Sequence, residues 1–235
     1  MFTRSKLRPT RRWPLNLTLV VLALLFPTKA ALADPLAIWN FNDSNLVVDH
    51  GPGTLTSSFI VTNIGFAAGT TNNARLGDPA GQALSLQSGS GNANNGGNIA
   101  AVVSTVGFAN IVVSFATQGT GTGFSSNQFQ YSLDGITFVD FGPPYVPLVA
   151  FGTMPIVFDL SGITALNDNP NAAFRIVFNG ATTATGNNRI DNLVIEGSTT
   201  TIPEPATITL VCTGLTTLIV RGCRRKSTGP GTKRT

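Results

Sequence analysis

Short apolar or alternating runs, separated by Gly, Asn, Pro and Asp, dominate residues 34–200. Alternation of apolar and polar residues is typical of β-strands that bury one face, and breaks rich in Gly and Pro are typical of turns. A period of about 3.6 residues, which would indicate helices, is nearly absent. The pattern predicts strands at residues 36–41, 57–61, 83–87, 99–103, 110–117, 128–133, 137–141, 156–159, 173–179 and 189–196.

The run AFRIVFN shows the alternation most clearly. Successive side chains of a strand point to opposite faces, so Phe174, Ile176 and Phe178 share one face while Arg175 and Val177 share the other. The chain is 42% apolar and long enough to bury one sizeable core. We therefore expect an all-β fold, an antiparallel β-sandwich.

An Asp-Gly pair at residues 134–135 lies between two of the apolar runs. Such a pair supplies the positive φ angles of a type I′ turn, which predicts a hairpin with a two-residue connection. That register sets Leu133 opposite Ile136 and Tyr131 opposite Phe138, with four large apolar groups on one face.

Three polar, Gly-rich stretches at residues 85–98, 118–127 and 180–188 separate some of the strands. Their composition offers little to bury, so we expect long flexible loops. Such loops are either solvated connectors or places where a ligand binds, and the sequence leaves both alternatives open.

The chain carries 15 basic and 11 acidic residues, and the two kinds are unevenly distributed. Six basic residues precede residue 34 and six follow residue 220, so only Arg75, Arg175 and Arg189 lie between. With ten acidic residues, the part between 34 and 200 has a formal charge of −7. Nucleic-acid affinity comes largely from Lys and Arg contacts with phosphates, so we expect no nucleic-acid partner.

The N-terminus has the three parts of an export signal. A basic segment at residues 4–12 is followed by an apolar stretch at 13–26, and Ala31 and Ala33 form a small-x-small cleavage pattern. The apolar stretch is shorter than the roughly 20 residues of a membrane-spanning helix, which favours cleavage over anchoring. We therefore predict a signal peptide at residues 1–33.

Near the C-terminus, residues 206–220 form an uncharged apolar run. A spanning helix needs about 17 to 25 residues, and snorkelling Arg side chains can extend a shorter run. We predict a single transmembrane helix here. Basic flanks stay on the cytoplasmic side, which places the body of the protein outside. The flanking residues are Arg221, Arg224, Arg225 and Lys226.

Pro203, Glu204 and Pro205 stand directly before this run. The two prolines fix an extended backbone, which either gives a peptidase a segment to grip or simply links the body to its anchor. The order of Pro-Glu-Pro, apolar helix and basic cluster closely resembles the PEP-CTERM sorting signal of exported proteins in Gram-negative bacteria that make exopolysaccharide. The resemblance covers residues 202–226 and identifies 201–235 as a sorting signal.

This resemblance implies a membrane-bound partner, an exosortase-type transpeptidase that cuts near the Pro-Glu-Pro step. The protein would be anchored transiently in the inner membrane and then reach the cell surface or extracellular matrix, where exopolysaccharide is a further partner. The expected organisation is a signal peptide at 1–33, a β-sandwich domain at 34–200 and the sorting signal at 201–235.

The body itself shows a second, looser resemblance, to bacterial jelly-roll domains of the carbohydrate-binding and discoidin-like kind. It rests on the groups Trp39-Asn40-Phe41, Tyr131 to Gly135 with Phe138, and Arg189 to Val194. The resemblance implies the jelly-roll form of the β-sandwich.

Sugar binding would need an exposed aromatic side chain. Trp39 and Tyr131 fall at strand positions that we expect to be buried, so Tyr145, in a Pro-rich loop, is the candidate ligand-binding residue. The alternative is that Tyr145 packs over one end of the sandwich.

Asp191 lies in the middle of a predicted strand between apolar neighbours, where an unpaired carboxylate is costly. Arg175 or Arg189 would neutralise it, or a cation would. In a jelly roll the first and last strands commonly pair, which would bring Asp43 near Asp191. Carboxylates suit Ca²⁺, so we predict a structural calcium site at these two residues as the one cofactor candidate.

Catalytic patterns are weak in the body. His50 is the only histidine, and no Gly-x-Ser-x-Gly elbow provides a nucleophile for it to activate. Asp134, Asp140 and Asp159 fall at turns or strand ends. We expect no catalytic residues and a structural or adhesive role at the cell envelope. The alternatives are a carbohydrate-binding module and a secreted hydrolase.

Overall fold

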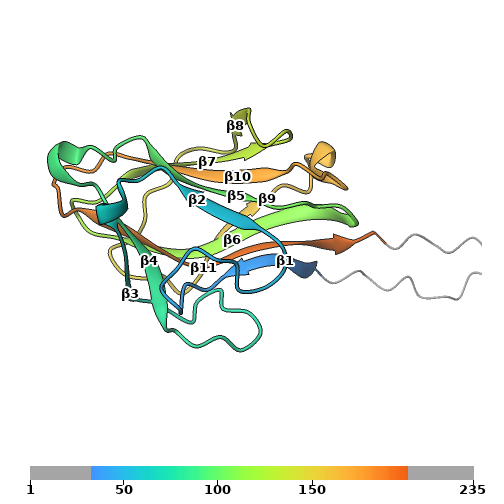
Figure 1. Cartoon of the computed structure of the whole chain (residues 1–235), viewed down its shortest axis with the longest axis horizontal. Helices are drawn as coiled ribbons and strands as arrows, with labels where there is room; N and C mark the ends of the chain where they lie inside the picture. The colour runs from blue at the N-terminus through green and yellow to red at the C-terminus, as the bar shows by residue number, and fades with distance from the viewer. Residues whose placement is uncertain (1–32, 201–235) are drawn as a thin grey trace, which may run out of the picture. The chain divides into compact units, whose positions relative to one another are not determined.

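The computed structural model describes residues 33–200, which form two stacked antiparallel sheets (Figure 1). Sheet A contains β1 (Ala33–Trp39), β3 (Ile64–Ala68), β4 (Gln82–Gln87), β6 (Phe108–Gly119), β9 (Ile156–Asp159) and β11 (Asn187–Thr199). Sheet B contains β2 (Thr54–Ser57), β5 (Gly97–Val102), β7 (Ser126–Ser132), β8 (Phe138–Asp140) and β10 (Ala173–Asn179). Three short 3-10 turns complete the described elements: η1 (Val61–Asn63), η2 (Ser90–Asn92) and η3 (Thr164–Leu166).

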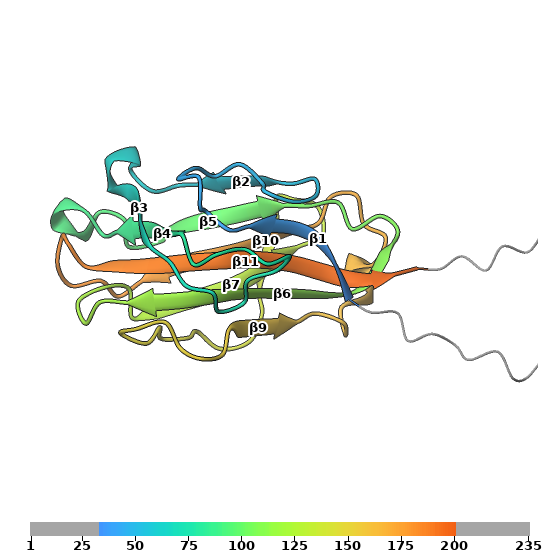
Figure 2. The same cartoon turned by 90° about the horizontal axis from the view of Figure 1, so that it is seen from below.

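The strand order is that of a jelly roll. Sheet A runs β3-β4-β11-β6-β9, and sheet B runs β2-β5-β10-β7-β8. Strand β1 pairs with the second half of β11, beside the part that pairs with β4 (Figure 2). The predicted antiparallel β-sandwich is therefore confirmed, and so is the expected pairing of the first strand with the last.

Aromatic side chains fill much of the space between the sheets. Phe59, Phe124 and Phe178 meet edge to face, with ring centroids 5.6 to 5.7 Å apart. Phe129 stacks on Phe158 at 4.0 Å. Phe174, Ile176 and Phe178 are all buried on one face of β10, as the alternation predicts.

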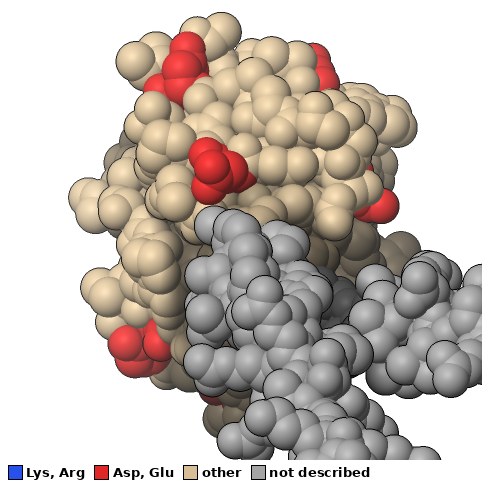
Figure 3. Space-filling model, turned by 90° about the vertical axis from the view of Figure 1, so that its right-hand side faces the viewer, with Lys and Arg blue, Asp and Glu red and all other residues tan. Residues whose placement is uncertain are grey.

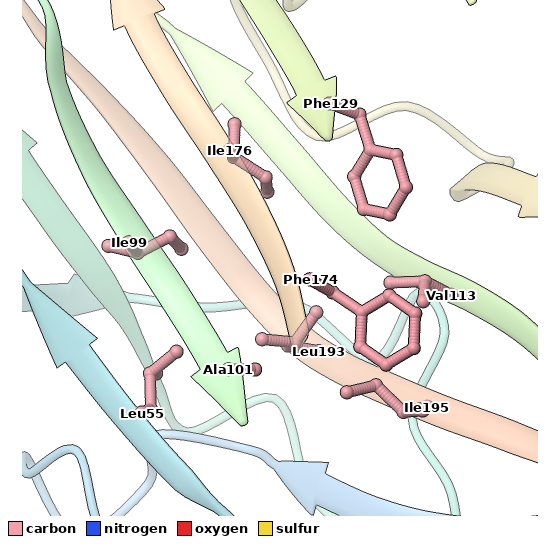
Figure 4. A pocket seen from close by; sticks show the side chains of 9 residues that line it. All are labelled: Leu55, Ile99, Ala101, Val113, Phe129, Phe174, Ile176, Leu193 and Ile195. Atoms are coloured by element: carbon pink, nitrogen blue, oxygen red, sulfur yellow. The ribbon is translucent and has the colours of Figure 1, made fainter. Parts of the chain in front are cut away.

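One small void lies in this core, lined only by apolar side chains that include Leu55, Phe129, Phe174 and Leu193 (Figure 4). Its volume of about 10 Å³ is near the smallest that holds one water molecule, and its lining offers no hydrogen-bond partner. This void is therefore a packing gap and not a ligand site.

Nine of the ten predicted strands coincide with observed ones to within a few residues. The strand predicted at 57–61 is wrong, because β2 ends at Ser57 and the chain then leaves the sheet, exposing Ile60 and Val61. Strand β3 was not predicted. Its sequence IGFAA is short, has Gly65 at its second position and shows no alternation of apolar and polar residues.

Strands β7 and β8 form the predicted hairpin in a different register. Tyr131 pairs with Val139 and Ser132 pairs with Phe138, which leaves residues 133–137 as the connection. The predicted two-residue turn is therefore wrong.

The side chain of Asp134 explains the longer connection. Its Oδ1 accepts hydrogen bonds from the backbone N–H groups of Ile136, at 2.8 Å, and Thr137, at 2.7 Å. These bonds hold the pKa of Asp134 well below its usual range, because they stabilise the ionised form. Positive φ occurs at Gly135 (76°), whereas a type I′ turn needs it at both central residues.

The three polar stretches are ordered by side-chain amides and hydroxyls. Asn94 is buried, donates to the Gln87 carbonyl at 2.7 Å and accepts from the N–H of Ile60 at 3.1 Å. Thr183 donates to the Thr122 hydroxyl at 2.9 Å, which links the stretches at 118–127 and 180–188. The expectation that such sequence has little to bury is wrong here. Buried Asn and Ser side chains form hydrogen bonds with backbone groups that no neighbouring strand pairs with.

The described ends of the chain lie together. Ala33 pairs with Ser198, so β1 begins where β11 ends. The charged side chains visible on this end of the sandwich are all acidic (Figure 3). The side chains of the predicted signal peptide, the Pro-Glu-Pro motif, the helix at 206–220 and the basic cluster lie outside the described residues. Between residues 33 and 200, no helix has the length and apolar character needed to cross a membrane.

The position of Phe178 predicts a large loss of stability on truncation. Phe178→Ala removes a fully buried ring and its two edge-to-face contacts, so the free energy of unfolding should fall by about 3 to 5 kcal/mol. Val177→Ala, one residue away on the opposite face, should cost less than about 1 kcal/mol. Urea denaturation of the full chain measures both, and equal losses would contradict the assigned faces.

Candidate functional site

A polar pocket of about 270 Å³ lies on the side of sheet A that faces away from sheet B. We call it the outer-face pocket. Strands β3, β4 and β11 supply its floor, and the turn before β3 supplies one side. Its lining residues are Thr62, Asn63, Ile64, Gly65, Phe66, Ala67, Ser85, Gln87, Asn187 and Arg189.

The alternation of β4 and β11 sends the polar residues outward. Leu84 and Leu86 are fully buried in the core, so Ser85 and Gln87 between and after them point the other way. The register then aligns Ser85 with Arg189 and Gln87 with Asn187 across the two strands. Four polar side chains therefore form two facing pairs on one rigid surface.

Most of these side chains are free to bind something else. The hydroxyl of Ser85 and the amide of Gln87 make no hydrogen bond to another residue between 33 and 200. The amide of Asn187 makes a single long bond, 3.4 Å, to the Thr185 carbonyl. Together they offer both donors and acceptors that the fold itself does not use.

Arg189 is held across the floor of the pocket. Its Nη1 donates to the Ala68 carbonyl at the end of β3, 3.1 Å away, although Arg189 itself belongs to β11. The side chain therefore crosses the intervening strand β4. Its Nε is buried and has no hydrogen-bond partner among the described residues.

A loop at residues 69–81 covers the neighbouring part of the same sheet face. The loop approaches the sheet at the bulge of β11 after Asp191. At the same point, the strand paired with β11 changes from β4 to β1. Asn192, with φ 48°, donates from its amide to the carbonyls of Thr70 (2.8 Å) and Asn72 (2.9 Å). Asn73 returns a bond of 2.8 Å to the Asn192 carbonyl.

Asp191 belongs to the same attachment. Its two carboxylate oxygens accept from the backbone N–H groups of Thr70, at 2.6 Å, and Asn192, at 2.9 Å. Gly69 passes so close to the carboxylate that a Cβ there would collide with it. Burial raises the pKa of Asp191 to about 7, and the two backbone hydrogen bonds oppose that shift.

The predicted charge partners of Asp191 lie elsewhere. Arg175 donates to Gln130 on sheet B, and Arg189 donates to the Ala68 carbonyl. Neither Arg forms a salt bridge with Asp191. The expectation that Asp191 needs an opposite charge is therefore wrong, because backbone N–H groups and a raised pKa serve instead.

The two residues of the predicted calcium site, Asp43 and Asp191, have different hydrogen-bond partners. Asp43 is exposed and accepts from the Asn45 amide at 2.6 Å. Burial raises the pKa of Asp49, a hydrogen bond from Asn40 opposes the shift, and the charge of Asp43 adds to it. Asp43 is thus close to Asp49, whereas Asp191 binds the loop at 69–81. Within the described part of the chain, no three His, Cys, Asp or Glu side chains gather to hold a metal ion.

Tyr145 packs into the end of the core. Its ring lies 6.0 Å from Phe115 and 6.2 Å from Phe158, and its hydroxyl is buried with no hydrogen-bond partner among residues 33–200. Burial raises the pKa of the phenol. The expectation of an exposed aromatic platform is therefore wrong for Tyr145, and its packing matches the alternative stated for it. Trp39 is fully buried, as expected.

The outer-face pocket was not predicted, because it contains neither an exposed aromatic platform nor a pair of carboxylates. The signal was present in the runs ALSLQ and NNRID, where Ser85, Gln87, Asn187 and Arg189 occupy alternate positions. Strand pairing was needed to show that the two runs are neighbours and that both polar faces point outward.

A larger pocket of about 380 Å³ lies between residues 46–48 and the start of β2. Apart from Thr54, its lining side chains are apolar, with Leu46, Val47 and Leu55 among them. A specific site needs a few well-placed polar groups, so the smaller outer-face pocket is the better candidate.

No protein-family model and no curated protein matches the chain. Solved structures similar to it include TmCBM61 in complex with β-1,4-galactotriose, at 9% identity and a TM-score of 0.40, covering 66% of this chain and 92% of that one. Domain 4 of AbnA, an extracellular arabinanase from Geobacillus stearothermophilus, in complex with arabinotriose, has 15% identity and a TM-score of 0.43, covering 71% and 94%. The K2 cleaved adhesin domain of Lys-gingipain has 11% identity and a TM-score of 0.40, covering 70% and 96%.

The raised pKa of Asp191 predicts a dependence of stability on pH. The folded state holds the proton up to about pH 7, and the unfolded state loses it near pH 4, so the free energy of unfolding should fall as pH rises between these values. The titration of Asp191 should lower the free energy of unfolding by roughly 2 to 4 kcal/mol across this pH range. Above pH 7 this contribution should stop changing.

Asp191→Asn keeps the shape of the side chain and removes its titration. The difference in unfolding free energy between wild type and variant should therefore change between about pH 4 and pH 7. Urea denaturation at several pH values measures it, and the other carboxylates cancel in the comparison. A difference independent of pH would show that Asp191 is ionised throughout.

Proposed function

We propose that the protein is an exported carbohydrate-binding β-sandwich that attaches to extracellular polysaccharide through the outer-face pocket. One observation carries the proposal. Ser85, Gln87 and Asn187 project from paired strands, and their hydrogen-bonding groups are largely unused by the fold. Hydroxyl and amide groups at fixed positions on rigid strands suit a ligand with many hydroxyl groups, such as a sugar chain.

The pocket favours binding over hydrolysis. Glycoside hydrolysis typically uses two carboxyl groups that flank the scissile bond. The lining of the outer-face pocket includes no Asp, Glu or His. His50 is exposed at the edge of another segment, where its backbone pairs with Ile38. An adhesive role by sugar binding therefore replaces a purely structural one, and a hydrolase has no support from this site.

The position of the pocket suits a protein whose export and sorting signals lie at its two termini. Gln87 and Asn187 lie where β4 ends and β11 begins, whereas the described ends of the chain meet at Ala33 and Ser198. The pocket is thus near the opposite end of β11. Export by the signal peptide and sorting by Pro203, Glu204 and Pro205 would leave this end of the sandwich free to contact the matrix.

Filling the pocket should abolish binding without harming the fold. Gly65 lies in β3, and a Cβ placed on it would meet nothing within 4 Å. Gly65→Leu should therefore project a side chain into the outer-face pocket and weaken polysaccharide binding by about tenfold or more. Affinity electrophoresis of the full chain, with polysaccharide purified from the producing cells, measures the effect.

Gly162→Leu is the matched control. Gly162 also has open space around its Cα and follows β9, at the other edge of sheet A. This variant should bind like wild type. If Gly65→Leu binds the polysaccharide as tightly as the wild type does, the sugar site lies elsewhere. If the polysaccharide does not slow the migration of the wild-type protein, the proposal is refuted.

The sorting part of the proposal is tested by the intact mass and the cellular fraction of the protein from its own cells. We expect a body that begins at Asp34 and ends near Pro203, found at the surface or in the matrix. An uncut tail in the inner membrane would reduce the Pro-Glu-Pro step to a linker.

A further inference from the structure

The three Arg residues of the body have different surroundings. Arg75 forms a salt bridge of 3.4 Å with Glu196. Arg175 donates to Gln130 at 2.7 Å and lies over the ring of Phe138, 3.9 Å from its centroid. Like Arg175, Arg189 has no carboxylate partner among residues 33–200, but it also lacks a side-chain acceptor, because a backbone carbonyl is its one acceptor there.

Two groups of Arg189 without a hydrogen-bond partner among residues 33–200, Nε and Nη2, share one edge of its guanidinium group. The bond from Nη1 to the Ala68 carbonyl fixes the group beside β3, while Nε is buried without a partner. Nε and Nη2 form the planar fork that binds both oxygens of a carboxylate. A buried donor without a partner costs free energy, so an anionic group that reached this edge would relieve that cost.

The charge of the rest of the body makes Arg189 distinctive. The part from 34 to 200 has a formal charge of −7, and Arg189 is the one charged residue in the lining of the outer-face pocket. An acidic polymer is repelled by most of such a surface, whereas the positive charge of Arg189 attracts it at the outer-face pocket. Long-range repulsion is screened beyond about 8 Å at physiological salt, whereas a close ion pair is screened much less.

We propose that the ligand is an acidic polysaccharide, with the carboxylate of a uronic acid unit bound by Arg189. Ser85, Gln87 and Asn187 then bind the hydroxyl groups of the same chain. This inference rests on the proposed sugar-binding function and names its substrate class. The planar fork of Arg189 favours an anionic sugar unit over a neutral one, because it pairs with two oxygens of the anion.

Polygalacturonate and its fully methyl-esterified form are matched probes, because the ester removes the charge and keeps the sugar backbone. We expect the full chain to bind the free acid roughly 10- to 100-fold more tightly at about pH 7 and about 0.15 M salt. Arg189→Gln should remove this preference. Arg189→Lys should restore little of it, because an ammonium group lacks the fork. Affinity electrophoresis gives the dissociation constants.

Arg175→Gln is the control for charge, since it removes one positive charge far from the pocket and should keep the preference. Equal binding of both polymers, lost in Gly65→Leu, would overturn the inference and leave the sugar-binding function standing. Binding of dextran sulfate as tight as that of polygalacturonate would show a general anion site and overturn the uronic acid assignment. If neither these polymers nor the cell's own polysaccharide binds, both proposals are wrong.

Discussion

The bulge at Asp191 and Asn192 in β11 is the constraint on which the rest of this structure depends. At this point the strand changes neighbours from β4 to β1, and the ladder on that side is interrupted. The backbone and side-chain groups freed there bind the loop at 69–81 through Thr70, Asn72 and Asn73. In a regular ladder, the backbone groups of a central strand are all paired with its neighbours. The bulge leaves some of these groups of β11 unpaired, and they bind the long loop.

This attachment divides the outer side of sheet A into two parts with different roles. The loop covers the part around Asn73 and Ser114, which bind each other in a buried position. The part around Ser85 and Arg189 stays open and polar. Strand β11 contains the bulge, binds the loop and contributes Asn187 and Arg189 to the pocket. The positions of these pocket side chains are therefore set by the paired strands of the sheet.

The sequence predicts the fold well because alternation is a local property. Strands such as 173–179 follow directly from the order of apolar and polar residues. Strand β3 could not be predicted, since IGFAA becomes a strand only by pairing with β4. The hairpin register depended on the Asp134 side chain, which caps a longer turn. The site could not be predicted for a similar reason. Ser85 and Arg189 are about a hundred residues apart in the sequence and become neighbours only through strand pairing.

The place of β11 in the chain also governs when the protein can fold. This last strand lies between β6 on one side and β4 and β1 on the other, so sheet A has no continuous centre until residues 187–199 are available. Pairing across such sequence distances is slow. A chain that emerges N-terminus first therefore stays unfolded until nearly all of it has appeared. An unfolded chain is the form that passes through a narrow translocation channel, so the topology is compatible with the export that we propose.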